Sequence, residues 1–246
     1  MTLFADPPVT APFAAFGRQH ILTLLTILGL SFCLPLWINR LRSPRASTLA
    51  ASILGTALLA AKAAELIWYA AEGVGWRNLL PLQLCDLAAF AAAATLFSRN
   101  RFVFELAYFW GMGGTLQALL TPDLSSGFPS ADFWFFFVPH GLVIAGIFFA
   151  TASLGLRPRP GSVLRVIIVT LIISIPVGAT DWLLGKDYMY LCRKPDTASL
   201  FDYLGPWPWY VLALLPLSAV LLSLWYSPFW IYDRRRERRD RRGSKP

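Results

Sequence analysis

Hydrophobic positions along the chain form seven continuous stretches of 19 to 24 residues, separated by short polar segments. The stretches are residues 20–38, 48–71, 79–97, 102–120, 132–152, 163–184 and 207–225. A helix of about 20 apolar residues crosses the hydrocarbon core of a bilayer. Because the stretches do not alternate, a spanning β-barrel is disfavoured. The pattern predicts an all-α, polytopic transmembrane helical bundle of seven spans, forming one domain over residues 1–246. Six spans with a re-entrant fifth segment are the alternative.

The composition agrees with a membrane location and argues against several soluble classes. Hydrophobic residues make up 56% of the chain and charged residues 15%, whereas soluble domains contain about 25% charged residues. The three cysteines and two histidines form neither a disulfide framework nor a zinc pattern, so we expect no metal and no cofactor. Nucleotide-binding and serine-hydrolase motifs are absent from the sequence as well.

Basic residues gather on one side of the predicted spans. The loops after the first, third and fifth spans, together with the C-terminal tail, carry 16 Lys and Arg, against 5 on the other side. The positive-inside rule then places the N-terminus outside and the C-terminus in the cytoplasm. The same rule accounts for the net charge of +8, so no nucleic-acid partner is expected. The basic tail over residues 233–246, and within it Arg234–Arg242, is expected to bind anionic lipid.

Polar side chains interrupt the predicted spans mainly in their outer halves. An ionisable group within the hydrocarbon region costs about 3 kcal/mol or more unless it is paired or hydrated, so such a group marks a candidate functional site. The candidates in or next to the spans are Lys62, Glu65, Gln83, Cys85, Asp86, Gln117, His140 and Asp181. The outer loops add Asp123, Tyr188 and Tyr190. Their common side predicts a polar cavity that opens outward.

Each of these residues also has a purely structural interpretation. Cys85 alone is more often a small buried hydrophobe than a nucleophile. His140 can bind the backbone carbonyl that Pro139 frees at Phe135, one turn back. The pairs that can simply join neighbouring helix positions or helices are Lys62 with Glu65 and Gln83 with Asp86.

Cys85 and His140 together suggest a catalytic site. Both are predicted to enter the membrane from the same side and to a similar depth, on helices that can be neighbours. A thiol with an imidazole base is the minimal pair for cysteine catalysis. Because apolar surroundings disfavour the thiolate, a nearby imidazole or the ammonium of Lys62 is needed. The sequence therefore predicts that Cys85 and His140 meet within the membrane.

Five short motifs follow one another from the third stretch to the loop before the seventh. They read LPLQLC at 80–85, WGMGGTLQALLTPD at 110–123, FPS at 128–130, PHG at 139–141, and DYMYL with a following KP at 187–195. Their order and spacing resemble the YwaF / TMEM164 family of integral membrane proteins.

This resemblance implies a multi-span, enzyme-like protein. The eukaryotic branch is regarded as a phospholipid acyltransferase that works through a cysteine and a histidine and moves polyunsaturated acyl chains onto lyso ether-phosphatidylethanolamine. Cys85 and His140 match those positions, whereas Asp187 stands where many relatives have Asn. The short, basic chain suggests a bacterial member in the cytoplasmic (inner) membrane.

The function we expect is that of a CoA-independent lipid transacylase, with phospholipids and lysophospholipids as substrates. Cys85 would form the acyl-enzyme and His140 would act as the base; with water as acceptor the same site would be a lipase or thioesterase. Candidate oxyanion donors are Gln83, Gln117 and Tyr188, and candidate phosphate ligands are Lys62, Arg193 and Lys194. One alternative is a transporter or small-ligand receptor with Lys62, Glu65 and Asp181 along its path. Another is a structural, partner-binding membrane protein.

Overall fold

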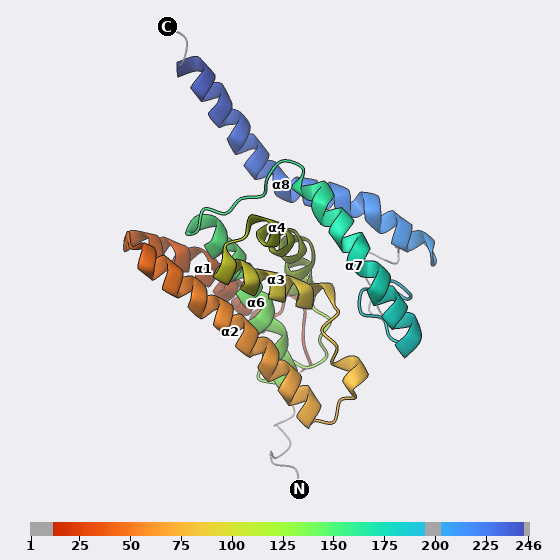
Figure 1. Ribbon diagram of the computed structural model, residues 1–246. Coiled ribbons are helices and arrows are strands. Elements are labelled where there is room, and N and C mark those ends of the chain that lie inside the picture. Colours follow the sequence, from red (N-terminus) through yellow and green to blue (C-terminus); the bar gives the residue numbers. More distant parts are fainter. Residues whose placement is uncertain (1–11, 195–202, 244–246) are drawn as a thin grey trace. The chain divides into compact units, whose positions relative to one another are not determined.

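The computed structural model describes residues 12–194 and 203–243. Within these ranges the regular structure consists of helices joined by loops, and there is no strand. A lone antiparallel bridge joins Pro12 and Ser126. The helices are α1 (Arg18–Arg40), α2 (Pro44–Ala71), η1 (Trp76–Asn78), α3 (Leu84–Ser98), α4 (Arg101–Trp110), η2 (Gly111–Thr115), α5 (Leu116–Leu120), α6 (Ala131–Ala152), α7 (Ser162–Leu184) and α8 (Trp209–Gly243) (Figure 1). The predicted all-α fold class is confirmed.

The chain divides into two compact units, and the single transmembrane domain expected from the sequence stays a prediction. The first unit, Met1–Leu156, contains α1 to α6, and the second, Arg157–Pro246, contains α7 and α8. Among the described helices, five are long and apolar enough to cross a membrane, namely α1, α2, α6, α7 and the part of α8 up to Arg236. The protein is therefore a helical membrane protein, while its orientation across the membrane stays a prediction.

Helix α3 is shorter than the apolar stretch that encodes it. It begins at Leu84, five residues after the predicted start at Leu79, and has 15 residues. At 1.5 Å per residue this is roughly 22 Å, less than the hydrocarbon core of about 30 Å. Pro81 disfavours a helical conformation of the residue before it, Leu80. Gln83 has an extended backbone and is the N-cap of α3. Asn78, which precedes the apolar stretch, ends the short 3₁₀ helix η1 and does not cap α3.

The fourth apolar stretch is helical over its whole length but changes type in the middle. A π-helical turn, η2, separates α4 from α5 at the sequence GMGGT. This turn lies against α6, because a Cβ atom on Gly111 would clash with Ile147 Cδ1. π-Helical turns are rare and often occur at functional sites. Gly111 thus allows a close helix contact at the point where the helix type changes.

Helix α3 occupies the centre of the first unit. It packs on α2, α4 and α6, as Figure 1 also shows, and α1 packs on α6. Five of its alanines are buried, namely Ala88, Ala89, Ala91, Ala92 and Ala93. Small side chains let helices approach closely in membrane proteins. A sequence that is apolar on all sides therefore forms a largely buried central helix, in which Phe90 and Phe97 stay exposed.

Two side chains tie the outer helices of this unit to its centre. His20 on α1 is fully buried; its Nδ1 accepts the Phe16 N–H at 2.9 Å and its Nε2 donates to the Leu119 carbonyl at 2.8 Å. Tyr69 on α2 donates its hydroxyl to Asp132 Oδ1 on α6 at 2.7 Å. His20 is thus a structural residue that holds the start of α1 against the end of α5.

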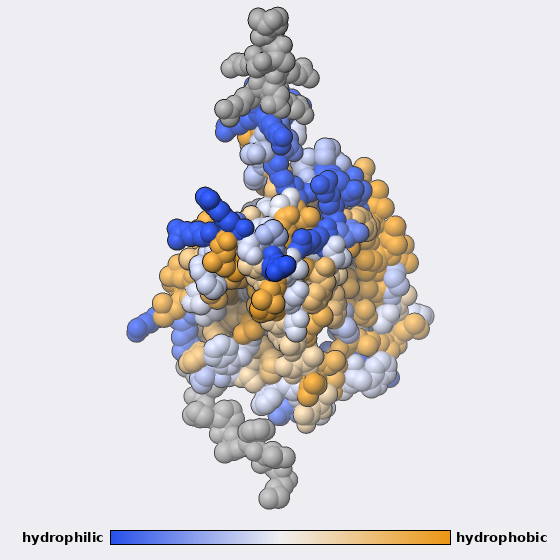
Figure 2. Space-filling model, turned by 60° about the vertical axis from the view of Figure 1, so that its left-hand side comes forward, coloured by the Kyte–Doolittle hydropathy of each residue, from blue (hydrophilic) through white to orange (hydrophobic). Residues whose placement is uncertain are grey.

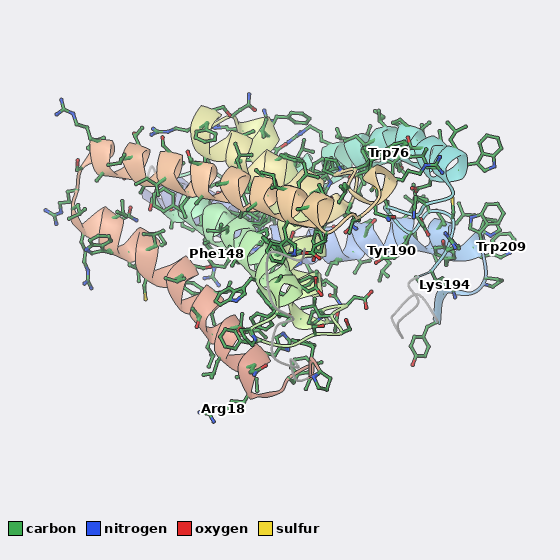
Figure 3. All side chains as sticks on the ribbon, turned by 90° about the horizontal axis from the view of Figure 1, so that it is seen from below. Arg18, Trp76, Phe148, Tyr190, Lys194 and Trp209 are labelled. Atoms are coloured by element: carbon green, nitrogen blue, oxygen red, sulfur yellow. The ribbon has the colours of Figure 1, made fainter. Side chains whose placement is uncertain are left out.

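The second unit consists of α7, α8 and the loop between them. The Tyr210 hydroxyl donates to the Tyr190 carbonyl at 2.8 Å, so the described part of the loop is tied to the start of α8. Figure 3 shows Tyr190, Lys194 and Trp209 together at this end of the unit. Helix α8 continues through the basic tail to Gly243, well beyond the predicted end of the span at Trp225.

The outer surface has the character of a lipid-facing protein. Large apolar side chains are exposed along α1, α2, α7 and α8, among them Leu25, Leu36, Ile67, Ile175 and Leu224. Hydrophobic residues occupy much of the face seen in Figure 2. Monomeric soluble proteins rarely expose apolar patches of this extent. The exposed leucines and isoleucines are accounted for by contact with acyl chains.

Candidate active site

Cys85 lies in the first turn of α3, as the second residue of the helix. The predicted span over residues 79–97 would start six residues before Cys85, but the helix begins only at Leu84. Within the described residues the backbone N–H groups of Leu84 and Cys85 have no hydrogen-bond partner. Such free donors, together with the helix dipole, favour negative charge at a helix N-terminus and are a common setting for reactive thiols.

Thr115, the last residue of η2, faces this turn. Its side chain is fully buried, and in the described part of the chain its hydroxyl has no hydrogen-bond partner. The Thr115 hydroxyl lies near the Cys85 thiol and interacts with it. The hydroxyl oxygen and the sulfur do not, however, form a hydrogen bond of ordinary geometry. A Cβ atom on the neighbouring Gly114 would lie 3.5 Å from Leu84 Cδ2, in ordinary contact. The π-helical turn therefore packs directly on the start of α3.

A cluster of three charged side chains anchors the same turn to α2. Lys62 Nζ lies 2.6 Å from Glu65 Oε2 and 2.6 Å from Asp86 Oδ1. Asp86 Oδ2 accepts the Gln83 N–H at 3.3 Å, so one carboxylate both caps α3 and binds α2. The proposed pairing of Lys62 with Glu65 is thus found, extended by Asp86. Lys62 neutralises part of the negative charge that Asp86 brings next to Cys85.

His140 approaches the site from α6. Its Nδ1 lies 2.7 Å from the Phe136 carbonyl oxygen and must donate to it, because a carbonyl only accepts. In a neutral ring Nε2 is then unprotonated and able to accept a proton. The ring also stacks on Phe136, with centroids 4.4 Å apart. The sequence had suggested the Phe135 carbonyl as the partner of His140, but the partner is the Phe136 carbonyl.

The charges of Lys62 and Asp86 connect the two candidate catalytic residues. Both charges are near enough to act on the Cys85 thiol and on the His140 ring, which come from α3 and α6. Within the described residues no hydrogen bond joins the thiol to the imidazole. Cys85 and His140 thus share the influence of the same two charges, and the predicted meeting of the thiol and the imidazole stays a prediction.

Of the other predicted residues, Gln83 caps the helix that carries Cys85, and the rest lie farther along the chain. In the first unit Gln83, Gln117 and Asp123 are exposed to the surroundings. In the second unit Asp181 is buried and its Oδ1 accepts the Tyr188 N–H at 3.0 Å. Tyr190 has a positive φ of 54° and belongs to the same loop. These interactions shape the end of α7 and its loop.

The sequence matches a known family over most of its length. Residues 15–226 match the TMEM164 family, and this range includes Cys85, Thr115 and His140. The chain belongs to the TMEM164 family. A protein of Treponema pallidum (strain Nichols), described only as an uncharacterized protein, is 25% identical over 158 residues, which are 64% of this chain and 65% of that protein. The chain thus matches slightly less than two thirds of that relative's length, and no solved structure matches it.

One group of side chains in this TMEM164-family protein has the atoms to hold a cation. Oxygen and sulfur atoms of Asp181, Asp187 and Cys192 lie within 4.8 Å of one another. However, Asp187 already accepts the N–H groups of Leu191, Cys192 and Arg193, at 2.8, 3.3 and 2.7 Å. Asp187 therefore acts first as an organiser of the loop.

Thr115 is the site residue that sequence reasoning missed. It stands in a motif that also carries the family resemblance, as a lone hydroxyl after two glycines in an apolar stretch. Gln117 drew attention instead because its side chain is longer and more polar. A helical repeat of 3.6 residues does not reveal a π-helical turn, so the orientation of Thr115 could not be deduced from spacing.

Proposed function

We propose that this TMEM164-family protein is a membrane-embedded lipid acyltransferase that works as a CoA-independent transacylase. Cys85 would carry the acyl group and His140 would transfer protons. The observation that carries this proposal is the position of the Cys85 thiol at the start of α3, near the same two charges as an imidazole whose Nδ1 is already occupied. A reactive thiol and an oriented base are the parts that acyl transfer requires.

In the first half-reaction, the Cys85 thiol passes its proton to His140 Nε2 and the sulfur attacks the carbonyl carbon of a phospholipid ester. The tetrahedral intermediate collapses, the ester bond breaks, and the leaving lysophospholipid oxygen takes the proton from His140. The acyl group remains on Cys85 as a thioester. Hydrogen bonds that are long in a free enzyme often tighten only when substrate is bound, which fits the absence of a resting contact.

In the second half-reaction, an acceptor lysophospholipid hydroxyl gives its proton to His140 and attacks the thioester carbonyl. The carbon–sulfur bond breaks, the acylated phospholipid leaves, and the thiolate recovers the proton. Lipid substrates are favoured because the site lies among helices whose outer surfaces are apolar.

The decisive test is acylation of Cys85. The purified protein is incubated in nanodiscs with a phospholipid that carries a labelled acyl chain, and the modified residue is identified by mass spectrometry. We expect a hydroxylamine-sensitive acyl group on Cys85 that disappears in Cys85→Ala. Cys33→Ala and Cys192→Ala are matched controls, because both thiols are exposed and should not affect turnover.

Lipid turnover that persists in Cys85→Ala, with Cys85 unmodified in the wild type, would overturn the mechanism. The transporter or receptor alternative predicts neither acyl-Cys85 nor any change in the acyl chains of the lipids. The assay therefore separates the two classes of function.

A further inference from the structure

Three hydrogen-bond donors lie at or against the first turn of α3, the turn that carries Cys85. Two are the backbone N–H groups of Leu84 and Cys85 in the first turn of α3, and the third is the Thr115 hydroxyl. Thr115 comes from a different helical segment and its side chain has no exposed surface. Buried polar groups are nearly always hydrogen-bonded, so an unpartnered one calls for an explanation such as a catalytic role.

The main-chain geometry that holds Thr115 in this place is unusual. Its turn, η2, is π-helical; Gly111 allows this turn to approach α6 closely, and Gly114 packs beside Leu84 of α3. A π-helical turn shifts the residues after it around the helix axis relative to a regular α-helix. A rare turn and a buried, unpartnered hydroxyl thus occur together at the same residue, next to the candidate nucleophile.

We propose that the Thr115 hydroxyl and the N–H groups at the start of α3 form the oxyanion hole of this enzyme, which makes Thr115 a catalytic residue. This inference rests on the proposed acyl transfer. When the Cys85 sulfur adds to the ester carbonyl, the electron pair of the C=O bond moves to oxygen, and the three donors stabilise the resulting oxyanion. On collapse the pair returns, and either the lysophospholipid oxygen or the sulfur leaves.

The donors suggested by the sequence fit this role less well. The side chains of Gln83 and Gln117 are exposed, and Tyr188 belongs to the second unit of the chain. Thr115 is buried and interacts with Cys85 itself. A donor in a site without water is worth more to an oxyanion than one in contact with solvent.

The test compares Thr115→Val, which keeps the shape but removes the hydroxyl, with Thr115→Ser, which keeps it. Both are made in a Cys33→Ser, Cys192→Ser background, so that Cys85 is the one reactive thiol. Two rates are measured in nanodiscs, namely acylation by a labelled phospholipid and alkylation by iodoacetamide. Alkylation displaces iodide and forms no oxyanion.

We expect Thr115→Val to lower the acylation rate by about 10²–10³-fold, as for the loss of one oxyanion donor. Thr115→Ser should retain most of the rate, and alkylation should be unchanged in both variants. Thr95→Val is the matched control, because Thr95 is equally buried but its hydroxyl donates to the Ala91 carbonyl at 2.7 Å. Thr115→Ala supplies a second variant without the hydroxyl should Thr115→Val not fold.

Each other outcome overturns the inference in a recognisable way. If the wild type is acylated and Thr115→Val is acylated equally fast, the oxyanion role is wrong and the proposed function stands. If acylation and alkylation fall together, Thr115 positions the thiol and does not bind the oxyanion. If the wild type forms no acyl-Cys85 at all, the proposed function fails and this inference fails with it.

Discussion

The imidazole of His140 is oriented by its own helix. Nδ1 reaches the carbonyl four residues earlier, that of Phe136, and the ring rests on the Phe136 side chain. Because His140 follows a helix proline, the sequence suggests that it binds the Phe135 carbonyl, which Pro139 leaves without a donor. The ring instead binds the Phe136 carbonyl, because that carbonyl lies four residues before His140, one helical turn away. This hydrogen bond favours proton transfer, because it fixes the tautomer whose Nε2 can accept a proton.

His140→Asn should separate orientation from proton transfer. Asparagine retains an N–H donor close to the place of Nδ1 but has no nitrogen that accepts a proton. We expect the rate of Cys85 acylation to fall by about 10²–10⁴-fold, the usual contribution of a general base. Thermal unfolding measured in the same detergent should be little changed. Wild-type acylation by His140→Asn would exclude His140 as the base.

At the scale of single elements, polar groups decide where the helices begin. The apolar pattern runs without interruption through residues 79–97, yet α3 starts only at Leu84, where Asp86 accepts the Gln83 N–H. The same carboxylate binds Lys62 on α2. The Asp86 carboxylate thus caps α3 and also joins α3 to α2. Both interactions help to fix the position of Cys85, the residue before Asp86.

Breaking this cluster should destabilise the first unit. Lys62→Met removes the ammonium and leaves two carboxylates largely buried, their side chains being 25% and 14% exposed for Glu65 and Asp86. Removing one partner of a buried ion pair costs about 3–5 kcal/mol, so the unfolding midpoint should fall markedly. The triple variant Lys62→Met, Glu65→Gln, Asp86→Asn should regain most of the loss.

The exposed pair of Arg157 with Asp233 provides the control for this experiment. Its side chains are 34% and 44% exposed, and exposed pairs contribute about 0–1 kcal/mol. Asp233→Asn should therefore leave the unfolding midpoint nearly unchanged. Equal losses in Lys62→Met and Asp233→Asn would contradict a special role for the Lys62 cluster.

The π-helical turn offers a second test at this scale. Gly111→Ala would drive a methyl group into Ile147 on α6, and overpacking of this kind costs about 1–3 kcal/mol. A matched substitution, Gly29→Ala on α1, meets no atom within 4 Å and should be neutral or slightly stabilising. Unfolding in detergent and the rate of Cys85 acylation are compared. A neutral Gly111→Ala would show that the close contact does not matter.

At the scale of the whole molecule, the chain consists of two helical units with apolar outer surfaces and a basic C-terminal helix extension. The charge distribution predicts that the loop after α7 lies outside and that the basic tail lies in the cytoplasm. Cys192 is an exposed thiol in that loop. It therefore reports on the orientation of the second unit without any added tag.

A variant with Cys192 as the one thiol, Cys33→Ser with Cys85→Ser, should react with a membrane-impermeant maleimide in intact cells. Partial burial and the carboxylates of Asp187 and Asp181 raise the pKa of the Cys192 thiol above its ordinary value. The reactive thiolate is therefore scarce at neutral pH, and labelling should speed up as the pH rises toward that raised pKa. Labelling that requires permeabilised cells would reverse the predicted orientation.

The sequence by itself determined that this is a helical membrane protein, because long apolar stretches can satisfy their backbone polar groups in lipid only as helices. It also singled out Cys85, His140 and Lys62, since a polar group in an apolar stretch is costly and therefore informative. Only the tertiary structure decided that α3 is short and central, that Lys62 binds Asp86 as well as Glu65, and that Thr115 faces Cys85. Hydrophobic spacing indicates which positions avoid water, whereas the pairing of buried polar groups depends on how separate helices meet.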